Sequence, residues 1–339
     1  MKFGPFPLAQ AEGAILAHSV ALKDGHLRKG RVLDAADLAA LAAAGHESLT
    51  LAQLDPSDMH EDAAALALAK ALVAEPQSHG LELRPVGTGR VNIVATQAGL
   101  VRLRAEDIHA VNLVDPAITV ATLPDLMRVE PGAMVATVKI IPYGVAVQSV
   151  EKACAVAGKG LRILAPVIRC ASLVQTWVGA PDDGTKGYRV TAARLQRLGV
   201  SLEQPCVVRH QIMPLADALL AATGEVVLIL TGSATSDLND TAPEALRSAG
   251  GEVIHFGMPV DPGNLLFLGR LQGRPVIGLP GCAKSPALNG ADWVIERVMC
   301  GLDVTPKQIM LMGVGGLLKE IPSRPRPRRQ GEPAAMQAD

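Results

Sequence analysis

The sequence predicts an α/β protein, with a mostly parallel sheet flanked by helices in its second half and a β-rich α+β region before it. Three observations lead to this fold class. In the second half, apolar runs alternate with segments of helical spacing, which is the pattern of βαβ units. The run VVLIL at 226–230 is continuously apolar, as a strand covered on both faces requires. In the first half, short β-type runs follow one another closely.

The length of 339 residues is too great for one ordinary domain. We predict an N-terminal α+β accessory region over 1–157 and an α/β domain over 158–320. The segment 321–339 is rich in Pro and Arg, and we expect it to be a disordered tail.

The first region opens with a predicted strand at 13–22 and a turn at 26–33. A helix is expected over 34–45, with Asp34 as its N-cap and Gly45 after its end. A strand at 47–54 and a longer amphipathic helix at 55–74 should follow. Short strands are then predicted within 84–96, 99–107, 117–123 and 134–147.

The second region contains predicted strands at 160–166, 206–212, 226–230, 251–256 and 274–280. Segments of helical spacing lie between or after these strands, at 185–199, 213–224, 241–251 and 285–301. Together they make the parallel sheet and its flanking helices.

Composition excludes several classes of function. Aromatic residues make up only 2% of the chain and the formal net charge is -1, which argues against a nucleic-acid surface. We find no signal-peptide pattern and no membrane-spanning run, so a cytoplasmic protein is expected. The five cysteines are scattered without a CxxC pair, which fits reduced thiols.

The segment 231–240, TGSATSDLND, directly follows the 226–230 strand and is a candidate phosphate site. Gly232 allows a sharp turn, and hydroxyl groups are offered by Thr231, Ser233, Thr235 and Ser236. Free N–H groups in such a turn and at the following helix start bind anions. Asp240 or Thr241 is the expected N-cap of that helix. The alternative is an ordinary strand-to-helix loop in which Asp240 is only a cap.

The segment 279–290, LPGCAKSPALNG, is the second candidate. Pro280 and Gly281 bend the chain, and Ser285 can cap the next helix or bind an anion. Lys284 adds a positive charge; the alternative is a capped loop with a surface lysine. If the two preceding strands are parallel neighbours, both segments lie on one rim of the sheet, where open α/β sheets bind ligands.

A Pro-Gly turn lies between these segments. Proline is second and glycine third in the run Asp261, Pro262, Gly263, Asn264, as a type II turn prefers. The side chain of Asn264 can hydrogen-bond a heterocycle, or it can simply complete the turn. The Gly-Thr-Gly run at 87–89 is followed by a strand-like segment, so we interpret it as a β turn and not as a dinucleotide fingerprint.

Three segments in order resemble the molybdopterin-binding domain shared by molybdopterin adenylyltransferases and molybdopterin molybdotransferases: TGSATSDLNDTAPEAL, HFGMPVDPGNLLFLGRL and VIGLPGCAKSP. That domain typically has a strand ending in Thr-Gly-Gly, a following Asp with Pro-Glu-Ala, and a later Leu-Pro-Gly-x-Pro-x-Ser loop. The resemblance covers about residues 158 to 320, and the matching residues are Thr231, Gly232, Asp240, Pro243, Glu244, Ala245, Leu279, Pro280, Gly281 and Ser285. The first half is more distantly similar to the accessory domains of the molybdotransferases.

The resemblance implies that molybdopterin, or its adenylylated or molybdenum-loaded form, binds between the turns at 231–240 and 281–286. N–H groups of 232–235 and of the Ser285 region would hold its phosphate, Lys284 would supply charge, and 261–264 would face the pterin. Asp240 would be the catalytic residue and bind Mg²⁺, or cap the helix. The implied reaction is adenylyl transfer with Mg²⁺ and ATP, or molybdate insertion.

Several residues depart from the family pattern. Ser233 and Thr235 replace glycines, and Asn264 replaces a lysine. His210 and Gln211 stand where active members place an acidic residue. A single remaining carboxylate favours a second hypothesis, a non-catalytic carrier or sensor of the cofactor. An unrelated α/β enzyme that uses a nucleotide or sugar phosphate is the third.

Longer relatives of this two-part bacterial layout continue, from about where SRPRPRRQ begins, into a domain similar to molybdenum cofactor cytidylyltransferases. Any cytidylyl transfer would then need a separate nucleotidyltransferase. The expected partners are molybdopterin and other molybdenum-cofactor enzymes, with no nucleic acid and no membrane. The resemblance also allows a homo-oligomer.

Overall fold

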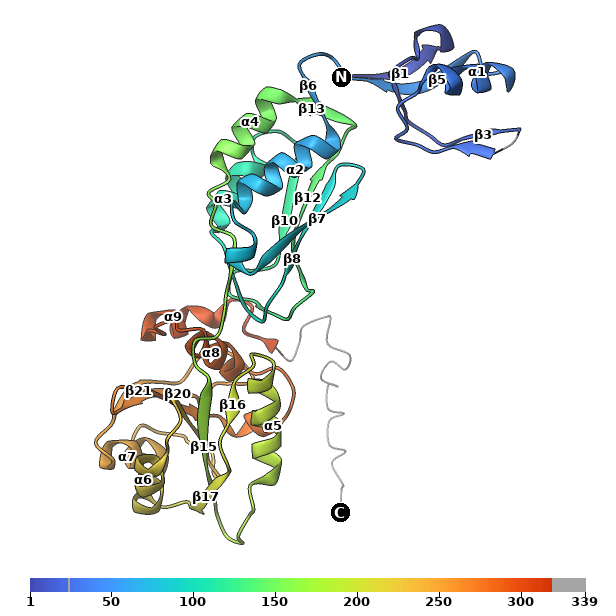
Figure 1. The fold of residues 1–339 in the computed structure, drawn as a ribbon. Coiled ribbons are helices and arrows are strands. Elements are labelled where there is room, and N and C mark those ends of the chain that lie inside the picture. Colours follow the sequence, from blue (N-terminus) through green and yellow to red (C-terminus); the bar gives the residue numbers. More distant parts are fainter. Residues whose placement is uncertain (24, 319–339) are drawn as a thin grey trace, which may run out of the picture. The chain divides into compact units, whose positions relative to one another are not determined.

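The computed structural model of the protein describes residues 1–23 and 25–318 (Figure 1). The chain divides into two compact units, Met1–Ala165 and a second unit that starts at Pro166, later than the predicted start at 158. The predicted tail at 321–339 lies outside the described residues. The structure confirms the fold class: a β-rich α+β first half and an α/β second half with a mostly parallel sheet.

The first unit begins with a small sheet in the order β1 (Lys2–Pro7), β5 (Ser48–Gln53), β2 (Ile15–Leu16). The predicted strand at 13–22 is divided into β2 and β3 (Val20–Leu22), and β3 pairs with β4 (Gly25–Leu27). The helix α1 (Ala35–Ala43) starts as predicted, because the Asp34 carboxylate accepts the N–H of Asp37 at 2.8 Å.

An antiparallel sheet follows in the order β10 (Ile118–Thr122), β12 (Met134–Ile140), β8 (Arg90–Ala95), β7 (Leu81–Gly87). Its core contains buried side chains from α2 (Glu61–Leu72), α3 (Ala105–Asn112) and α4 (Val147–Val156). The predicted helix start at 55 is wrong, because β6 (Asp58–His60) first pairs with β13 (Gly144–Ala146). The β turn predicted at 87–89 is present, with positive φ at all three residues.

The predicted strand at 160–166 belongs to the first unit. It forms β14 (Arg162–Leu164), which pairs antiparallel with β9 (Gly99–Arg102), while β11 (Arg128–Val129) pairs with the other edge of β9. A Cβ on Gly99 would lie 2.2 Å from the carbonyl oxygen of Leu164, so glycine permits this close pairing. The apolar pattern around β14 predicts a strand, but it does not show which sheet that strand joins.

The described part of the second unit contains seven strands. Six of them run in the same direction, and β20 runs antiparallel between β21 and β19. The order is β16 (Ser201–Leu202), β15 (Cys170–Trp177), β18 (Val226–Leu230), β21 (Arg274–Leu279), β20 (Phe267–Leu271), β19 (Glu252–Phe256), and β17 (Cys206–Arg209) also pairs with β15. The strands β15, β16 and β20 were not predicted from the sequence.

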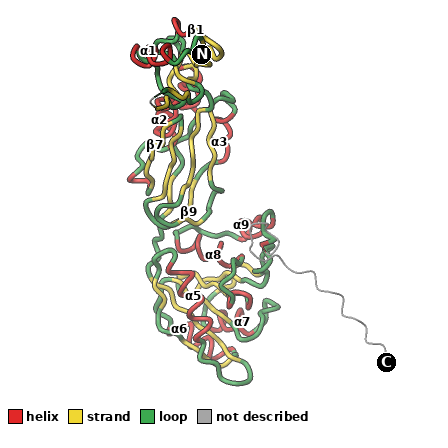
Figure 2. Tube along the Cα trace, turned by 90° about the vertical axis from the view of Figure 1, so that its right-hand side faces the viewer, coloured by secondary structure: helices red, strands yellow, loops and turns green. Residues whose placement is uncertain are grey.

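Helices cover both faces of this sheet (Figures 1 and 2). Buried side chains of α6 (Ile212–Ala221) and α7 (Thr241–Ser248) share one core cluster with Val227 and Ile229 of β18. Because side chains alternate along a strand, Leu230 faces the other side, where α5 (Thr185–Gln196) packs closely enough that a Cβ on Gly187 would lie 2.7 Å from it. An ion pair joins α5 to α8 (Gly290–Met299), and the short α9 (Pro306–Met310) follows.

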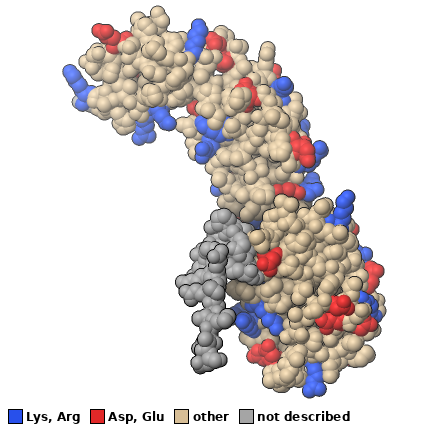
Figure 3. Space-filling view, turned by 180° about the vertical axis from the view of Figure 1, so that it is seen from behind, with Lys and Arg blue, Asp and Glu red and all other residues tan. Residues whose placement is uncertain are grey.

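The surface charges are mixed in sign. Acidic and basic side chains are interspersed over the face drawn in Figure 3. Within residues 1–23 and 25–318, no helix is long and apolar enough to cross a membrane.

Candidate functional site

Parallel pairing brings the candidate segments to one edge of the second sheet. Leu230 at the end of β18 is in register with Leu279 at the end of β21, and β15 and β17 also end on this side. The connection from β19 to β20, residues 257–266, lies at the same edge, because β20 is antiparallel to both of its neighbours. We call this the carboxyl-end edge; it is the usual ligand side of an open α/β sheet.

The loop 231–240 is held tightly against β15 at its start. A Cβ on Gly232 would lie 2.7 Å from the carbonyl oxygen of Thr176, so no other residue fits there without a shift. The N–H of Gly232 donates to the hydroxyl of Thr176 at 2.9 Å. Thr176 was not predicted as a site residue, because the polar residues of β15 interrupt the apolar pattern by which a strand is predicted.

The next peptide units of this loop leave N–H groups that the described residues do not bind. The buried Thr231 hydroxyl donates to the carbonyl oxygen of Ser233 at 2.5 Å. In a trans peptide the following N–H, that of Ala234, points in the opposite direction. Within the described part of the chain, the N–H groups of Ser233, Ala234 and Thr235 have no hydrogen-bond partner. Three such consecutive donors suit an anion.

Asp240 closes the loop as the N-cap of α7, which decides between the two predicted caps. One carboxylate oxygen accepts the N–H of Thr241 at 2.6 Å, and the other accepts the N–H of Ser236 at 3.0 Å. The carboxylate thus fixes the second half of the loop and starts the helix. Its roles in catalysis and metal binding stay predictions.

His210 follows β17 and lies beside the same loop. Its Nδ1 is 2.9 Å from the hydroxyl of Thr176, the group that also accepts the N–H of Gly232. Burial lowers the pKa of His210, and the negative charge of Asp240 partly opposes this effect. Gln211 is exposed, precedes α6 and makes no side-chain cap.

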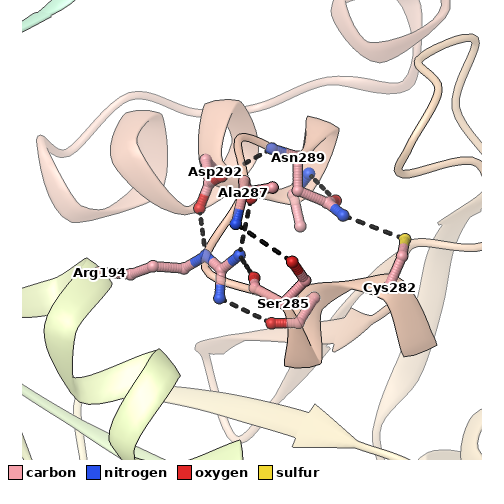
Figure 4. A network of polar contacts seen from close by, with 8 residues as sticks. Arg194, Cys282, Ser285, Ala287, Asn289 and Asp292 are labelled. Atoms are coloured by element: carbon pink, nitrogen blue, oxygen red, sulfur yellow. Dashed lines mark hydrogen bonds and ion pairs between the residues drawn. The ribbon is translucent and has the colours of Figure 1, made fainter. Parts of the chain in front are cut away.

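The loop after β21 is fixed by Arg194 of α5 (Figure 4). The Nε of Arg194 is 2.6 Å from Asp292 of α8, and its terminal nitrogens donate to the carbonyl oxygens of Ala283 at 2.7 Å and Ser285 at 2.6 Å. The nitrogen that donates to Ser285 also donates to the carbonyl oxygen of Ala287 at 3.2 Å. Arg194 was not predicted as a site residue, because nothing in the helical pattern of α5 distinguishes it from the exposed arginines Arg189 and Arg197.

The prediction that Ser285 caps the helix after this loop is wrong. Gly281–Lys284 form a short 3₁₀ helix, and α8 starts only at Gly290, with Asn289 as its N-cap. Asn289 accepts the N–H of Ala291 at 3.0 Å, whereas the Ser285 hydroxyl accepts the N–H of Ala287 at 3.3 Å. The first N–H groups of α8 therefore have partners and are not free for an anion.

The Pro-Gly turn packs against the start of α8. The carbonyl oxygen of Pro262 accepts the N–H of Gly290 at 2.8 Å, and a Cβ on Gly263 would lie 2.9 Å from Gly290. The predicted type II turn is wrong, because Gly263 has φ 147, far from the value of about +80 at that position of the turn. Asn264 is exposed, and its amide donates to the carbonyl oxygen of Met258 at 3.2 Å.

Comparisons with known proteins identify the domain that carries these loops. Residues 186–299 match the model of a family described as a probable molybdopterin binding domain. These residues form a domain of that family. The match confirms the resemblance seen in the sequence and supports a role related to molybdenum cofactor biosynthesis. Residues 5–53 match a second model, described as a domain of unknown function.

Two solved structures are among those similar to the chain. The first is the molybdopterin biosynthesis moea protein from Pyrococcus horikosii, with 13% identity, a TM-score of 0.30 and coverage of 88% of this chain and 75% of that one. The second is the protein CinA, with unknown function, from Thermoplasma acidophilum, with 16% identity, a TM-score of 0.24 and coverage of 34% and 90%. No curated protein sequence matches the chain.

The residues at the carboxyl-end edge of the molybdopterin-binding domain fit a phosphate group. The loop 231–240 offers three N–H donors that have no partner among the described residues, and Lys284 lies in the neighbouring loop. Among residues 1–23 and 25–318, no group of three or more His, Cys, Asp and Glu side chains could hold a metal ion.

Proposed function

We propose that the second unit binds molybdopterin at its carboxyl-end edge, and that the protein acts in molybdenum cofactor biosynthesis or handling. One observation carries the proposal: after two intervening residues beyond the buried strand β18, the matched domain has three consecutive N–H groups that find no partner among the described residues. Donors fixed in this way suit the terminal phosphate of a phosphorylated pterin, because they need no reorganisation on binding.

The neighbouring loops supply the other contacts. Lys284 would contribute charge from the 3₁₀ helix, and the hydroxyl of Ser285 would lie beside it. The turn with Pro262, Gly263 and Asn264 would contact the pterin, with Pro280 and Gly281 shaping the loop next to it. Arg194 holds that loop in place.

The reaction class that fits such a ligand is adenylyl transfer from Mg-ATP or insertion of molybdate. Asp240 would be the catalytic and Mg²⁺-binding residue, at the end of the phosphate loop. Each oxygen of its carboxylate has a lone pair left after accepting one N–H.

One observation favours the second candidate, a carrier or sensor that binds the cofactor without transforming it. Both Asp240 oxygens already accept backbone N–H groups, as a helix cap requires. In that case the carboxylate shapes the phosphate loop, and the bound cofactor passes unchanged to a molybdenum-cofactor enzyme.

One experiment separates these candidates. The purified full chain would be given molybdopterin with Mg-ATP, and separately adenylylated molybdopterin with molybdate, while pterin binding and AMP are followed. Transfer of AMP to the pterin with release of pyrophosphate, or release of AMP when molybdate is inserted, supports the enzyme. Tight pterin binding without either supports the carrier. The absence of pterin binding would refute both.

A variant pair then tests Asp240. Asp240→Asn keeps a side-chain oxygen for the helix cap but removes the charge. An enzyme should lose AMP transfer in this variant and keep its fold, whereas a carrier should keep pterin binding. Asp217→Asn on the exposed face of α6 is the matched control.

A further inference from the structure

The imidazole of His210 lies between the two ends of the 231–240 loop. Its Nδ1 shares the Thr176 hydroxyl with the N–H of Gly232, at 2.9 Å each, where the loop begins. The Asp240 carboxylate, where the loop ends, is near enough to influence the charge of the ring. Arg209, the preceding residue, lies instead over the Trp177 ring, at 5.1 Å from its centroid.

The hydrogen-bond network assigns the tautomer of this ring. The Thr176 side chain is only 5% exposed, and its oxygen already accepts the N–H of Gly232. A buried hydroxyl also needs an acceptor for its own hydrogen, and within the described residues His210 Nδ1 is the group in reach. The neutral ring, which burial favours, therefore carries its hydrogen on Nε2.

Nε2–H is thus a donor on a ring whose other nitrogen contacts Thr176, the residue that also binds the start of the 231–240 loop. Within the described residues it makes no hydrogen bond, and the same holds for the hydroxyl of Thr235, whose residue is 5% exposed. The N–H groups of Ser233, Ala234 and Thr235 also have no partner there. A protonated Nε2 cannot bind a metal ion, but it can donate to an anion.

We propose that Nε2–H of His210 binds the phosphate of the ligand together with the N–H groups of Ser233, Ala234 and Thr235. The inference rests on the proposed function, and it names the side chain that determines how the phosphate is held. Phosphate binding at this edge then depends on hydrogen-bond donors and needs no divalent cation. Thr176 is a positioning residue, because it fixes the ring and the first N–H of the loop with one hydroxyl.

The experiment uses two probes on the full chain. Inorganic phosphate is titrated while the ¹⁵N and ¹H signals of the imidazole of His210 are followed, with His210→Gln used to assign them. Molybdopterin binding is then measured in EDTA and in Mg²⁺ for the wild type, His210→Ala, His210→Gln and Thr176→Val. His109→Ala on α3 of the first unit is the matched control, because His109 is exposed. Urea unfolding checks that each variant folds.

We expect phosphate to shift the Nε2–H signal and EDTA to leave wild-type binding unchanged. Loss of one hydrogen bond to a charged group should weaken molybdopterin binding about 10- to 100-fold in His210→Ala. The amide of His210→Gln should restore part of this loss, and Thr176→Val should weaken binding while His109→Ala does not.

Two results would overturn the inference while leaving the proposed function intact: molybdopterin binds His210→Ala as tightly as the wild type, or it binds the wild type only with Mg²⁺. If molybdopterin does not bind the wild type but phosphate still shifts the His210 signals, the proposed function fails and the anion site stands. If neither probe acts, both fail.

Discussion

Removal of the Arg194 guanidinium should destabilise the second unit by more than any other single substitution considered below. The side chains of Arg194 and Asp292 are 8% and 9% exposed and lie 2.6 Å apart. Arg194→Ala would leave the Asp292 carboxylate buried without its cation. Losing one partner of a buried pair costs about 3–5 kcal/mol. The freed carbonyl groups of Ser285 and Ala287 are in exposed residues, so water can replace their donors. The carbonyl group of the buried Ala283 also loses its donor, so about 3–5 kcal/mol is the lower bound of the expected loss.

Tryptophan fluorescence provides a selective assay. The chain has two tryptophans, Trp177 and Trp293, and both lie in the second unit. Urea unfolding followed by their emission therefore reports this unit, and Arg194→Ala should lower its free energy of unfolding by at least about 3–5 kcal/mol. The matched control is Arg197→Ala, an exposed arginine beside the end of α5, which should change it by less than about 0.5 kcal/mol.

The geometry of the guanidinium gives a second comparison. Arg194→Lys keeps the charge but cannot reach Asp292 and two carbonyl groups at once, so it should recover only part of the loss. A loss below about 1 kcal/mol in Arg194→Ala would refute the reasoning, because the pair would then not be acting as a buried one.

Three further predictions concern the same sheet. Gly232→Ala should lower the free energy of unfolding by about 1–3 kcal/mol and weaken molybdopterin binding, because its Cβ would lie 2.7 Å from the carbonyl oxygen of Thr176. The control is Gly281→Ala, whose Cβ would have no atom within 4 Å and should leave stability unchanged; equal stabilities of the two variants would contradict the steric argument. Because the pKa of His210 is lowered in the folded protein, the unfolded chain takes up the proton first as the pH falls. The stability of the wild type should therefore decline below about pH 6.5 more steeply than that of His210→Gln. Parallel urea-unfolding profiles of the two proteins would disprove this. Hydrogen bonds from Ser172 and Thr223 lower the pKa of Glu203, so the stability that they add should be present above about pH 4.5 and lost as the pH falls further. Glu203→Gln should remove this acid dependence of urea unfolding, and an unchanged profile would argue against those bonds.

Local signals predicted much of the second sheet, but they missed its strand β15. The run VVLIL is apolar throughout and became β18, buried along its whole length. In β15 the polar side chains of Ser172, Gln175 and Thr176 interrupt the apolar pattern, yet each is at most 5% exposed. The partners of Ser172 and Thr176 lie 31 and 34 positions along the chain, at Glu203 and His210, and a local pattern cannot show them.

The candidate site was likewise predicted from the sequence only in part. Parallel topology alone was enough to place the loops after β18 and β21 at one edge, and Asp240 was identified as a cap from its sequence context. The partners of those loops could not be predicted. Arg194 reaches Asp292 across 98 positions of the chain, and the ring of His210 meets Thr176 across 34. The Ser285 cap failed because Asn289 is an equally good cap nearer to the helix.

Binding of molybdopterin to the purified full chain tests the central claim most directly. Equilibrium dialysis would measure it, with inorganic phosphate as competitor and Gly232→Ala as the variant with a disturbed loop. We predict saturable binding at one site per chain, weakened by phosphate and by the substitution. If molybdopterin does not bind, or binds equally well to Gly232→Ala and regardless of phosphate, the loop 231–240 is not its phosphate site and the account is wrong.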